Sequence, residues 1–199
     1  MVNGSLLHFL RGPGKNTTLS KLIDFGSQIA AGMAYLESHN FIHRDLAARN
    51  ILVSKERTVK VADFGLARFT NENVYEVKEG TKVPIKWTAP ESILTGLFTI
   101  KSDVWSFGVV LYEIISYGNT PYATLSNTDT LRFLKSGKRL ECPENCPQDL
   151  YEHVMLKCWN WEPVNRPTFD SLQYLLEDLQ LKPDYREPNL MYNSQSTSL

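Results

Sequence analysis

The chain has 199 residues, of which 42% are hydrophobic and 22% charged, an ordinary composition for one globular domain with a sizeable core. A formal charge of −1 and a pI near 6.4 argue against nucleic acid or an anionic membrane as partner, because such binding rests on an excess of lysine and arginine. The three cysteines (Cys142, Cys146 and Cys158) lack the C-x-x-C redox spacing and a companion pair for zinc, which favours free thiols in a reducing cytosol.

The first elements in the chain are predicted to be helical. A short amphipathic stretch at 1–10 is followed by a glycine-rich segment at 12–17 that predicts a turn between helices. Between 20 and 38, apolar residues recur every three or four positions, which is the helical period. Thr18 or Ser20 is available as the N-cap, so we expect a long helix here.

A β-hairpin is predicted next. Two short β-branched runs, 51–54 and 58–62, flank a charged segment at 55–57. The chain then becomes polar at 71–75, and such a segment is a candidate for a switch between ordered and disordered states.

The second half of the chain is predicted to be nearly all helical. The apolar run from 101 to 117 contains Ser106 and Glu113 and is too short to span a bilayer, so it predicts a buried helix. Further helical stretches are separated by prolines, at 131–133, 150–159 and 169–179. Residues 182–199 are too polar to offset the entropy of ordering, so we expect a flexible C-terminal tail there.

Polar and charged residues gather on both sides of the predicted hairpin. The run His43-Arg44-Asp45-Leu46-Ala47-Ala48-Arg49-Asn50 precedes it, and Asp63-Phe64-Gly65 follows it. A loop, a hairpin and a second loop can bring Asp45, Asn50 and Asp63 to one place. Two oxygen ligands for a hard divalent cation, with one further carboxylate to accept a hydroxyl proton, are the groups that phosphoryl transfer requires.

These two motifs resemble the catalytic loop and the metal-binding loop of protein kinases. The resemblance implies an ATP-dependent phosphotransferase with Mg²⁺, or Mn²⁺ as the alternative. In that template Asp45 orients the acceptor hydroxyl and takes its proton, while Asn50 and Asp63 hold the metal ion. The resemblance also implies that Met1 and Leu52 bind the nucleotide, with Leu52 supporting the adenine ring.

Two features resemble tyrosine kinases in particular. Serine/threonine kinases typically carry lysine two residues after the catalytic aspartate, whereas Leu46-Ala47-Ala48-Arg49-Asn50 has the tyrosine-kinase pattern with a catalytic Arg49. The segment 82–87 resembles the tyrosine-kinase substrate shelf, where Pro84 packs against the acceptor ring. The resemblance therefore implies tyrosine in protein substrates as the acceptor.

Two tyrosines have the positions of regulatory sites. Tyr75 lies where tyrosine kinases place an activating phosphorylation site, and Arg44 and Arg68 are the cations expected to pair with its phosphate. The alternative is an ordinary exposed tyrosine. Tyr185 lies near the position of the inhibitory tail tyrosine of Src-family kinases, although its flanking residues match poorly, and a plain tail tyrosine remains the alternative.

Other motif residues resemble structural positions of the family. Glu91 and Arg166 resemble a buried ion pair, and Asp103 resembles the residue that holds the catalytic-loop backbone. His43 resembles a packing residue beneath Phe64. Arg44 is assigned a structural role, and three of the four tryptophans, Trp87, Trp105 and Trp159, are expected in the core.

The likeness is greatest to cytoplasmic, Src-like non-receptor kinases, on the segments 85–91 and 99–108. Arg49 directly before Asn50 departs from the Src family and is similar to Abl, Csk and receptor-type enzymes. Because no glycine-rich loop or Val-Ala-Ile-Lys strand precedes His43, residues 1–181 resemble the C-terminal lobe alone, a mainly α lobe with the short hairpin carrying both loops.

The function implied is therefore a partial tyrosine-kinase catalytic domain, expected to be weakly active or inactive by itself. A truncated, non-catalytic module that binds kinase substrates or regulators is the alternative. A helical adaptor would give no reason for Asp45, Asn50 and Asp63 together. The expected partners are protein substrates, the missing N-terminal lobe and SH2/SH3-type domains, without nucleic acid or a transmembrane segment. The expected location is cytoplasmic, with membrane-peripheral attachment through other regions left open.

Overall fold

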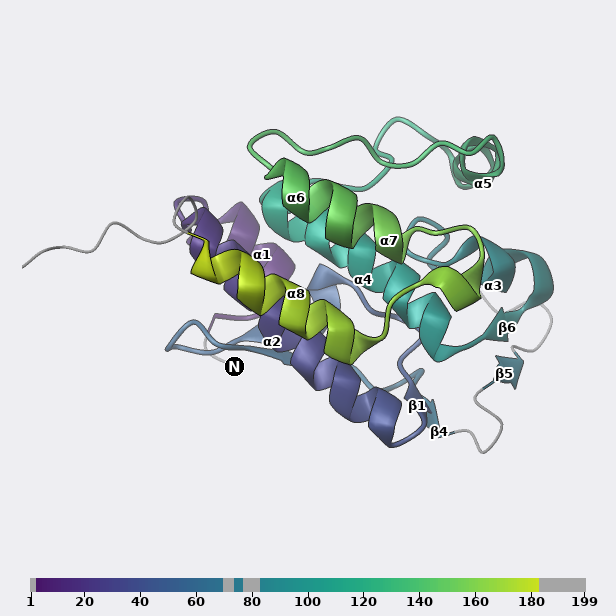
Figure 1. Ribbon diagram of the computed structural model, residues 1–199, viewed down its shortest axis with the longest axis horizontal. Coiled ribbons are helices and arrows are strands. Elements are labelled where there is room, and N and C mark those ends of the chain that lie inside the picture. The colour runs from purple at the N-terminus through teal and green to yellow at the C-terminus, as the bar shows by residue number, and fades with distance from the viewer. Residues whose placement is uncertain (1–2, 70–73, 77–82, 183–199) are drawn as a thin grey trace, which may run out of the picture.

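The computed structural model describes residues 3–69, 74–76 and 83–182, and it confirms a mainly helical lobe with small antiparallel strand pairs (Figure 1). The α-helices are α1 (Leu6–Arg11), α2 (Leu19–Ser38), α3 (Pro90–Thr95), α4 (Ile100–Ile115), α5 (Asn127–Lys135), α6 (Gln148–Leu150), α7 (Leu156–Cys158) and α8 (Phe169–Leu181). Single turns of other helix types are η1 (Ala48–Asn50), η2 (Tyr151–Met155) and η3 (Pro163–Asn165).

Within the described residues, the strands form three separate antiparallel pairs. The predicted hairpin is present as β2 (Ile51–Val53) with β3 (Val59–Val61), and Ile51 lies opposite Val61. Two further pairs join segments distant in sequence: β1 (Phe41–Ile42) with β4 (Arg68–Phe69), and β5 (Tyr75–Glu76) with β6 (Leu97–Phe98). These two-residue strands have no periodicity of their own, and therefore the sequence did not predict them.

The core is organised around α4, which is buried on nearly all sides. Its N-terminus is closed by a capping box between Thr99 and Ser102. A Cβ on Gly108 would lie 2.6 Å from the indole nitrogen of Trp159, so only glycine allows this approach. On another side, a Cβ on Gly26 would lie 2.8 Å from Leu111, which shows how closely α2 approaches α4. Helix α8 runs beside α2 on the viewed face (Figure 1).

The predicted helix boundaries needed small corrections. The central helix ends at Ile115 instead of 117, because Tyr117 and Gly118 have φ angles of 54° and 86° and cannot continue a right-handed helix. The stretch 150–159 is not one α-helix, since the π-helical turn η2 interrupts it. The tail at 183–199 and residues 71–73 of the predicted switch lie outside the described residues.

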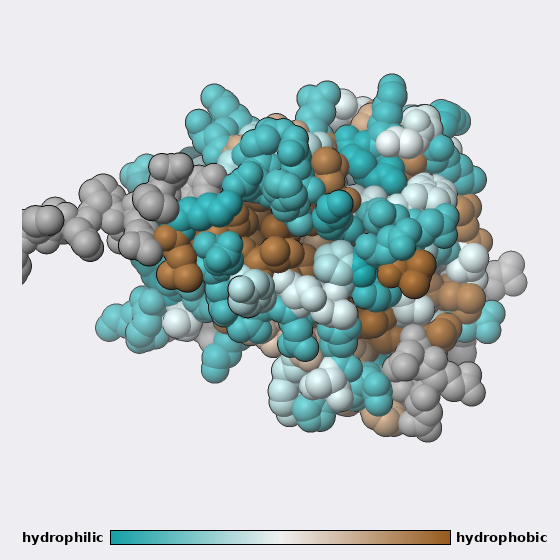
Figure 2. Space-filling view, viewed as in Figure 1, coloured by the Kyte–Doolittle hydropathy of each residue, from teal (hydrophilic) through white to brown (hydrophobic). Residues whose placement is uncertain are grey.

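The surface seen in Figure 2 is largely hydrophilic, with hydrophobic side chains showing between the helices. In the part of the chain that the structure describes, no helix has the length and apolar character needed to cross a membrane. All three cysteines are free thiols, and Cys158 is buried.

Candidate active site

The loop from His43 to Asn50 is held at its beginning by Asp103, from the first turn of α4. One carboxylate oxygen accepts the backbone N–H of His43 at 2.7 Å, and the other accepts that of Arg44 at 2.9 Å. Asp103 is 1% exposed, and this burial raises its pKa to about 6, against the lowering effect of His43 and the two backbone hydrogen bonds. The loop entry, with Arg44 at φ 68°, is therefore fixed by a side chain sixty positions away.

A second buried carboxylate from α4 holds the end of the same loop. Oε2 of Glu113 accepts the backbone N–H of Ala48 at 2.9 Å and the indole N–H of Trp87 at 3.0 Å. Burial raises the pKa of Glu113, while these two hydrogen bonds lower it. Sequence reasoning assigned no site role to Glu113. Glu113 is a single charged residue inside a long apolar run. A buried charge requires hydrogen-bond partners, so this pattern was the signal that could have identified it.

Asp45, Arg49 and Asn50 lie together at the centre of the loop. The turn η1 folds the chain back, so that the Asn50 amide nitrogen donates to the Asp45 carboxylate at 2.8 Å and to the Asp45 carbonyl at 2.7 Å. Arg49 forms an ion pair with the other Asp45 oxygen. The Arg49 guanidinium also lies 4.6 Å from the centre of the Trp87 ring. Two neighbours thus orient the Asp45 carboxylate, which remains partly open to solvent at 19% exposure.

Asn50 and Asp63 lie at the same end of the β2–β3 hairpin. The backbone N–H of Ala62 donates to the carbonyl of Asn50 at 2.9 Å, and Asp63 follows directly with a left-handed φ of 58°. The Asp63 carboxylate is exposed, and its only described hydrogen bond comes from the Gly65 N–H at 3.4 Å. The Asn50 amide nitrogen donates to Asp45, which leaves the amide oxygen as the atom of this side chain that can bind a cation.

This donor set fits a hard cation that shares its ligands with a bound molecule. One carboxylate and one amide oxygen are the oxygen donors that Mg²⁺ uses in proteins when phosphates and water complete its shell. No cluster of three histidine, cysteine, aspartate or glutamate side chains suited to a metal occurs within residues 3–69, 74–76 and 83–182.

Tyr75 lies between two arginines. The Arg44 guanidinium is 4.1 Å from the centre of the Tyr75 ring, and that of Arg68 is 5.9 Å away. Hydrogen bonding to Arg68, and then to Arg44, lowers the pKa of Tyr75. The pairing of β5 with β6 holds this backbone beside Leu97 and Phe98. The two cations that the sequence assigned to a phosphate at Tyr75 are thus the ones beside its ring.

The segment that contains Pro84 forms a tight turn beside the loop. The Pro84 carbonyl accepts the N–H of Trp87 at 2.9 Å and the hydroxyl of Thr88 at 3.0 Å. Lys86 donates to the carbonyl of Tyr122 at 2.8 Å. Trp87 is half-buried and packs against the core instead of lying within it as predicted, and the Arg49 guanidinium lies over its ring. We call residues 83–88 the shelf.

The remaining predicted residues are placed as follows. His43 is fully buried, with its Nε2 3.0 Å from the Ala62 carbonyl and its ring 5.5 Å from that of Phe64, which is half exposed. Leu52 is half-buried in β2 and forms an isolated β-bridge with Ser5. Met1 and Tyr185 lie outside the described residues.

Glu91 and Arg166 form a bidentate ion pair away from the catalytic loop 43–50. The guanidinium nitrogens donate to the two Glu91 oxygens at 2.6 and 2.8 Å. Arg166 donates in addition to the carbonyls of Asn160 and Lys101, at 2.9 and 2.8 Å. Its side chain is fully buried, whereas that of Glu91 is 27% exposed.

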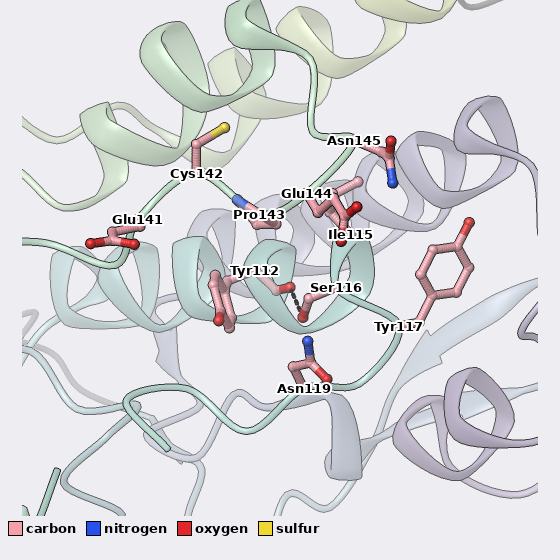
Figure 3. A pocket seen from close by; sticks show the side chains of 10 residues that line it. All are labelled: Tyr112, Ile115, Ser116, Tyr117, Asn119, Glu141, Cys142, Pro143, Glu144 and Asn145. Carbon is pink, nitrogen blue, oxygen red and sulfur yellow. Dashed lines mark hydrogen bonds between the residues drawn. The ribbon is translucent and has the colours of Figure 1, made fainter. Parts of the chain in front are cut away.

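A separate cavity of about 300 Å³ lies at the C-terminal end of α4 (Figure 3). Tyr112, Ser116 and Asn119 line it on one side, and Cys142 and Asn145 line it from a separate loop. None of its lining residues belongs to the loop 43–50 or to the shelf. The cavity therefore does not contribute to the site built around Asp45.

A helical lobe whose hairpin presents an aspartate, an asparagine and a second aspartate at one end is characteristic of protein kinases. Residues 1–176 match the family described as protein tyrosine and serine/threonine kinase. The chain belongs to this family.

Among curated proteins, the chain is similar to two kinases of Spongilla lacustris. It is 55% identical to Tyrosine-protein kinase SRK3 over 192 residues, which cover 94% of this chain and 57% of that protein. It is 54% identical to Tyrosine-protein kinase SRK2 over 178 residues, covering 89% of this chain and 49% of that protein. The chain thus spans about half the length of the relatives it matches.

Proposed function

We propose that this chain is the C-terminal lobe of a protein tyrosine kinase of the non-receptor, Src-like type, which transfers the terminal phosphoryl group of ATP to tyrosine in protein substrates. The observation that carries the proposal is the placement of Asp45 between Arg49 and Asn50, with Asp63 at the same end of the hairpin. In this proposal residues 1–181 form the lobe, and 182–199 are a separate C-terminal segment.

The proposed division of labour follows from the contacts. Asp45 orients the acceptor hydroxyl and accepts its proton, and Arg49 keeps the carboxylate directed at the shelf. The Asn50 amide oxygen and the Asp63 carboxylate hold a divalent cation, Mg²⁺ or Mn²⁺, which neutralises phosphate charge when bound. Leu52, and Met1 by resemblance, contact the nucleotide.

Three observations support tyrosine as the acceptor. The Arg49 guanidinium lies over the ring of Trp87, so the catalytic loop and the shelf are in contact. Pro84 lies in the shelf, at the position that it has in the tyrosine-kinase pattern. SRK3 and SRK2 are both named tyrosine-protein kinases. A cytoplasmic location and SH2/SH3-type neighbouring domains are parts of the same proposal, supported by the Src-like segments, and so is an inhibitory role of Tyr185.

The direct test joins the chain to a small kinase lobe. A chimera with the small lobe of SRK3 placed before residue 1, which we call the completed kinase, should phosphorylate a tyrosine peptide and not its serine counterpart. The isolated chain should be at least about tenfold slower, because the small lobe covers the phosphates and completes the lysine–glutamate pair. The measurement is radiolabelled phosphate transfer with matched protein concentrations.

The outcome separates the two candidate functions. A folded but inactive completed kinase that still binds the peptide would favour the non-catalytic binding module. Rapid tyrosine phosphorylation by the isolated chain would contradict the requirement for a second lobe. A shift of activity to the serine peptide would contradict the assignment of Arg49 and Pro84.

Tyr75→Phe should lower the activity of the completed kinase after incubation with ATP. A phosphate on Tyr75 brings about −1.5 to −2 charges between Arg44 and Arg68 and orders this segment, and phenylalanine cannot accept it. The measurement is the initial rate before and after autophosphorylation. Tyr174→Phe, at a 70% exposed tyrosine of α8, is the matched control and should leave the increase intact. Identical kinetics of the Tyr75 variant and the unaltered enzyme would rule out the regulatory role.

A further inference from the structure

Glu113 connects two parts of the site that the sequence separates. Its Oε2 atom receives one hydrogen bond from the catalytic loop, at the N–H of Ala48, and one from the shelf, at the indole of Trp87. Both bonds end on the same oxygen atom. A displacement of the loop relative to the shelf would therefore break at least one of them.

The residues next to these two contacts are the ones assigned to chemistry. Ala48 directly precedes Arg49 and Asn50 in the turn η1. The ring of Trp87 carries the Arg49 guanidinium, and Arg49 forms the ion pair with Asp45. The chain of contacts thus runs from Glu113 through Trp87 and Arg49 to the proposed catalytic carboxylate.

The Glu113 carboxylate is buried in an apolar part of α4, where it loses its hydration. Glu113 is 1% exposed, and the positions beside it in the helix, Tyr112 and Ile114, pack with the apolar core. A charged group in such surroundings is tolerated only where hydrogen bonds compensate for lost hydration. The shelf is tied to the same helix a second time, because the Ser106 hydroxyl donates to the Trp87 carbonyl at 2.8 Å.

We propose that Glu113 is a positioning residue for phosphoryl transfer, which aligns the catalytic loop with the substrate shelf through the Ala48 N–H and the Trp87 indole. It touches neither substrate nor nucleotide and acts through Arg49 and Asp45. The inference rests on the proposed kinase function. Loss of the Glu113 carboxylate should lower the rate of the chemical step, while the lobe should still fold.

The test uses the completed kinase and two substitutions at one position. Glu113→Met keeps the volume and removes the acceptor, and we expect kcat to fall about tenfold to a hundredfold, since small misplacements of reacting groups have effects of this size. Glu113→Gln can place its amide oxygen where Oε2 lies and accept both N–H groups. We expect its kcat to remain within about threefold of the unaltered enzyme.

Two further variants separate positioning from general destabilisation. Leu111→Ala removes a buried side chain of α4 that faces Gly26 of α2, away from the loop, and should lower Tm while leaving kcat unchanged well below Tm. Trp87→Phe keeps an aromatic ring for Arg49 and deletes the indole donor together with the second ring. In the Glu113→Met background, Trp87→Phe should cause no further loss of kcat, because both changes break the hydrogen bond between the Trp87 indole and residue 113.

Each result supports or overturns the positioning role of Glu113. Unchanged kcat in Glu113→Met, a glutamine variant as slow as the methionine variant, or additive losses with Trp87→Phe would overturn the proposal. If Glu113→Met does not fold, the Trp87→Phe rate alone decides: a reduced kcat supports the link, and an unchanged kcat overturns it. If the completed kinase itself is inactive, the proposed function fails, and amide exchange at Ala48 still tests the link, since exchange should be faster in Trp87→Phe.

Discussion

Asp45→Asn should lower kcat of the completed kinase by about two to four orders of magnitude, the range expected when a general base is removed. Asparagine has nearly the same shape, but it carries no charge and cannot accept the hydroxyl proton. It also deprives Arg49 of its ion-pair partner. The measurement is the steady-state rate of tyrosine-peptide phosphorylation at saturating ATP.

The matched control is Asp24→Asn on α2. Asp24 likewise pairs with a cation, Lys21 at 2.5 Å, and accepts a hydrogen bond from Gln28 at 2.7 Å, but it lies on the surface of a different helix. This variant should keep full activity. Retention of more than about a tenth of the rate by Asp45→Asn would remove Asp45 from the role of base and contradict the assignment on which the proposed mechanism depends.

Glu91→Leu should lower the free energy of unfolding by about 3–5 kcal/mol, because it leaves the buried guanidinium of Arg166 without a counter-charge. Asn160 and Lys101 would still accept hydrogen bonds from Arg166, but their carbonyls carry no full negative charge. The measurement is denaturant-induced unfolding of the completed kinase, followed at constant pH and salt.

Two comparisons make this prediction specific. The double variant Glu91→Leu with Arg166→Met should recover much of the lost stability, since no unpaired charge remains buried. Arg132→Ala breaks an exposed pair with Asp129, in which the arginine is 74% exposed, and should cost less than about 1 kcal/mol. A Glu91→Leu cost no larger than that of Arg132→Ala would show that the pair is not a structural support.

The hairpin and the two main helices could be predicted because their signals are local. The β-branched runs at 51–54 and 58–62 became β2 and β3, and the helical period at 20–38 became α2. The π-helical turn η2 and the early end of α4 were missed. Both depend on backbone angles, such as φ of 54° at Tyr117, that a hydrophobic pattern does not record.

The grouping of Asp45, Asn50 and Asp63 could also be predicted from local signals. Asp45 and Asn50 are five positions apart, so the short turn η1 brings them into contact with little help from the rest of the chain. Asp63 reaches the same end of the hairpin because equal strand lengths return the chain to Asn50. These relations follow from local geometry. The chemical roles of the three side chains stay predictions until the variants are measured.

The amino-acid sequence by itself thus determined the family, the long helices α2, α4 and α8, and the group of side chains around Asp45. Tertiary structure alone decided what holds that group in place: Glu113 meets Ala48 and Trp87 from positions 65 and 26 residues away, and Arg49 stacks on Trp87. The physical reason is the range of the interactions. Helical period and turn geometry act between near neighbours, whereas a buried carboxylate finds its hydrogen-bond donors only when distant segments pack together.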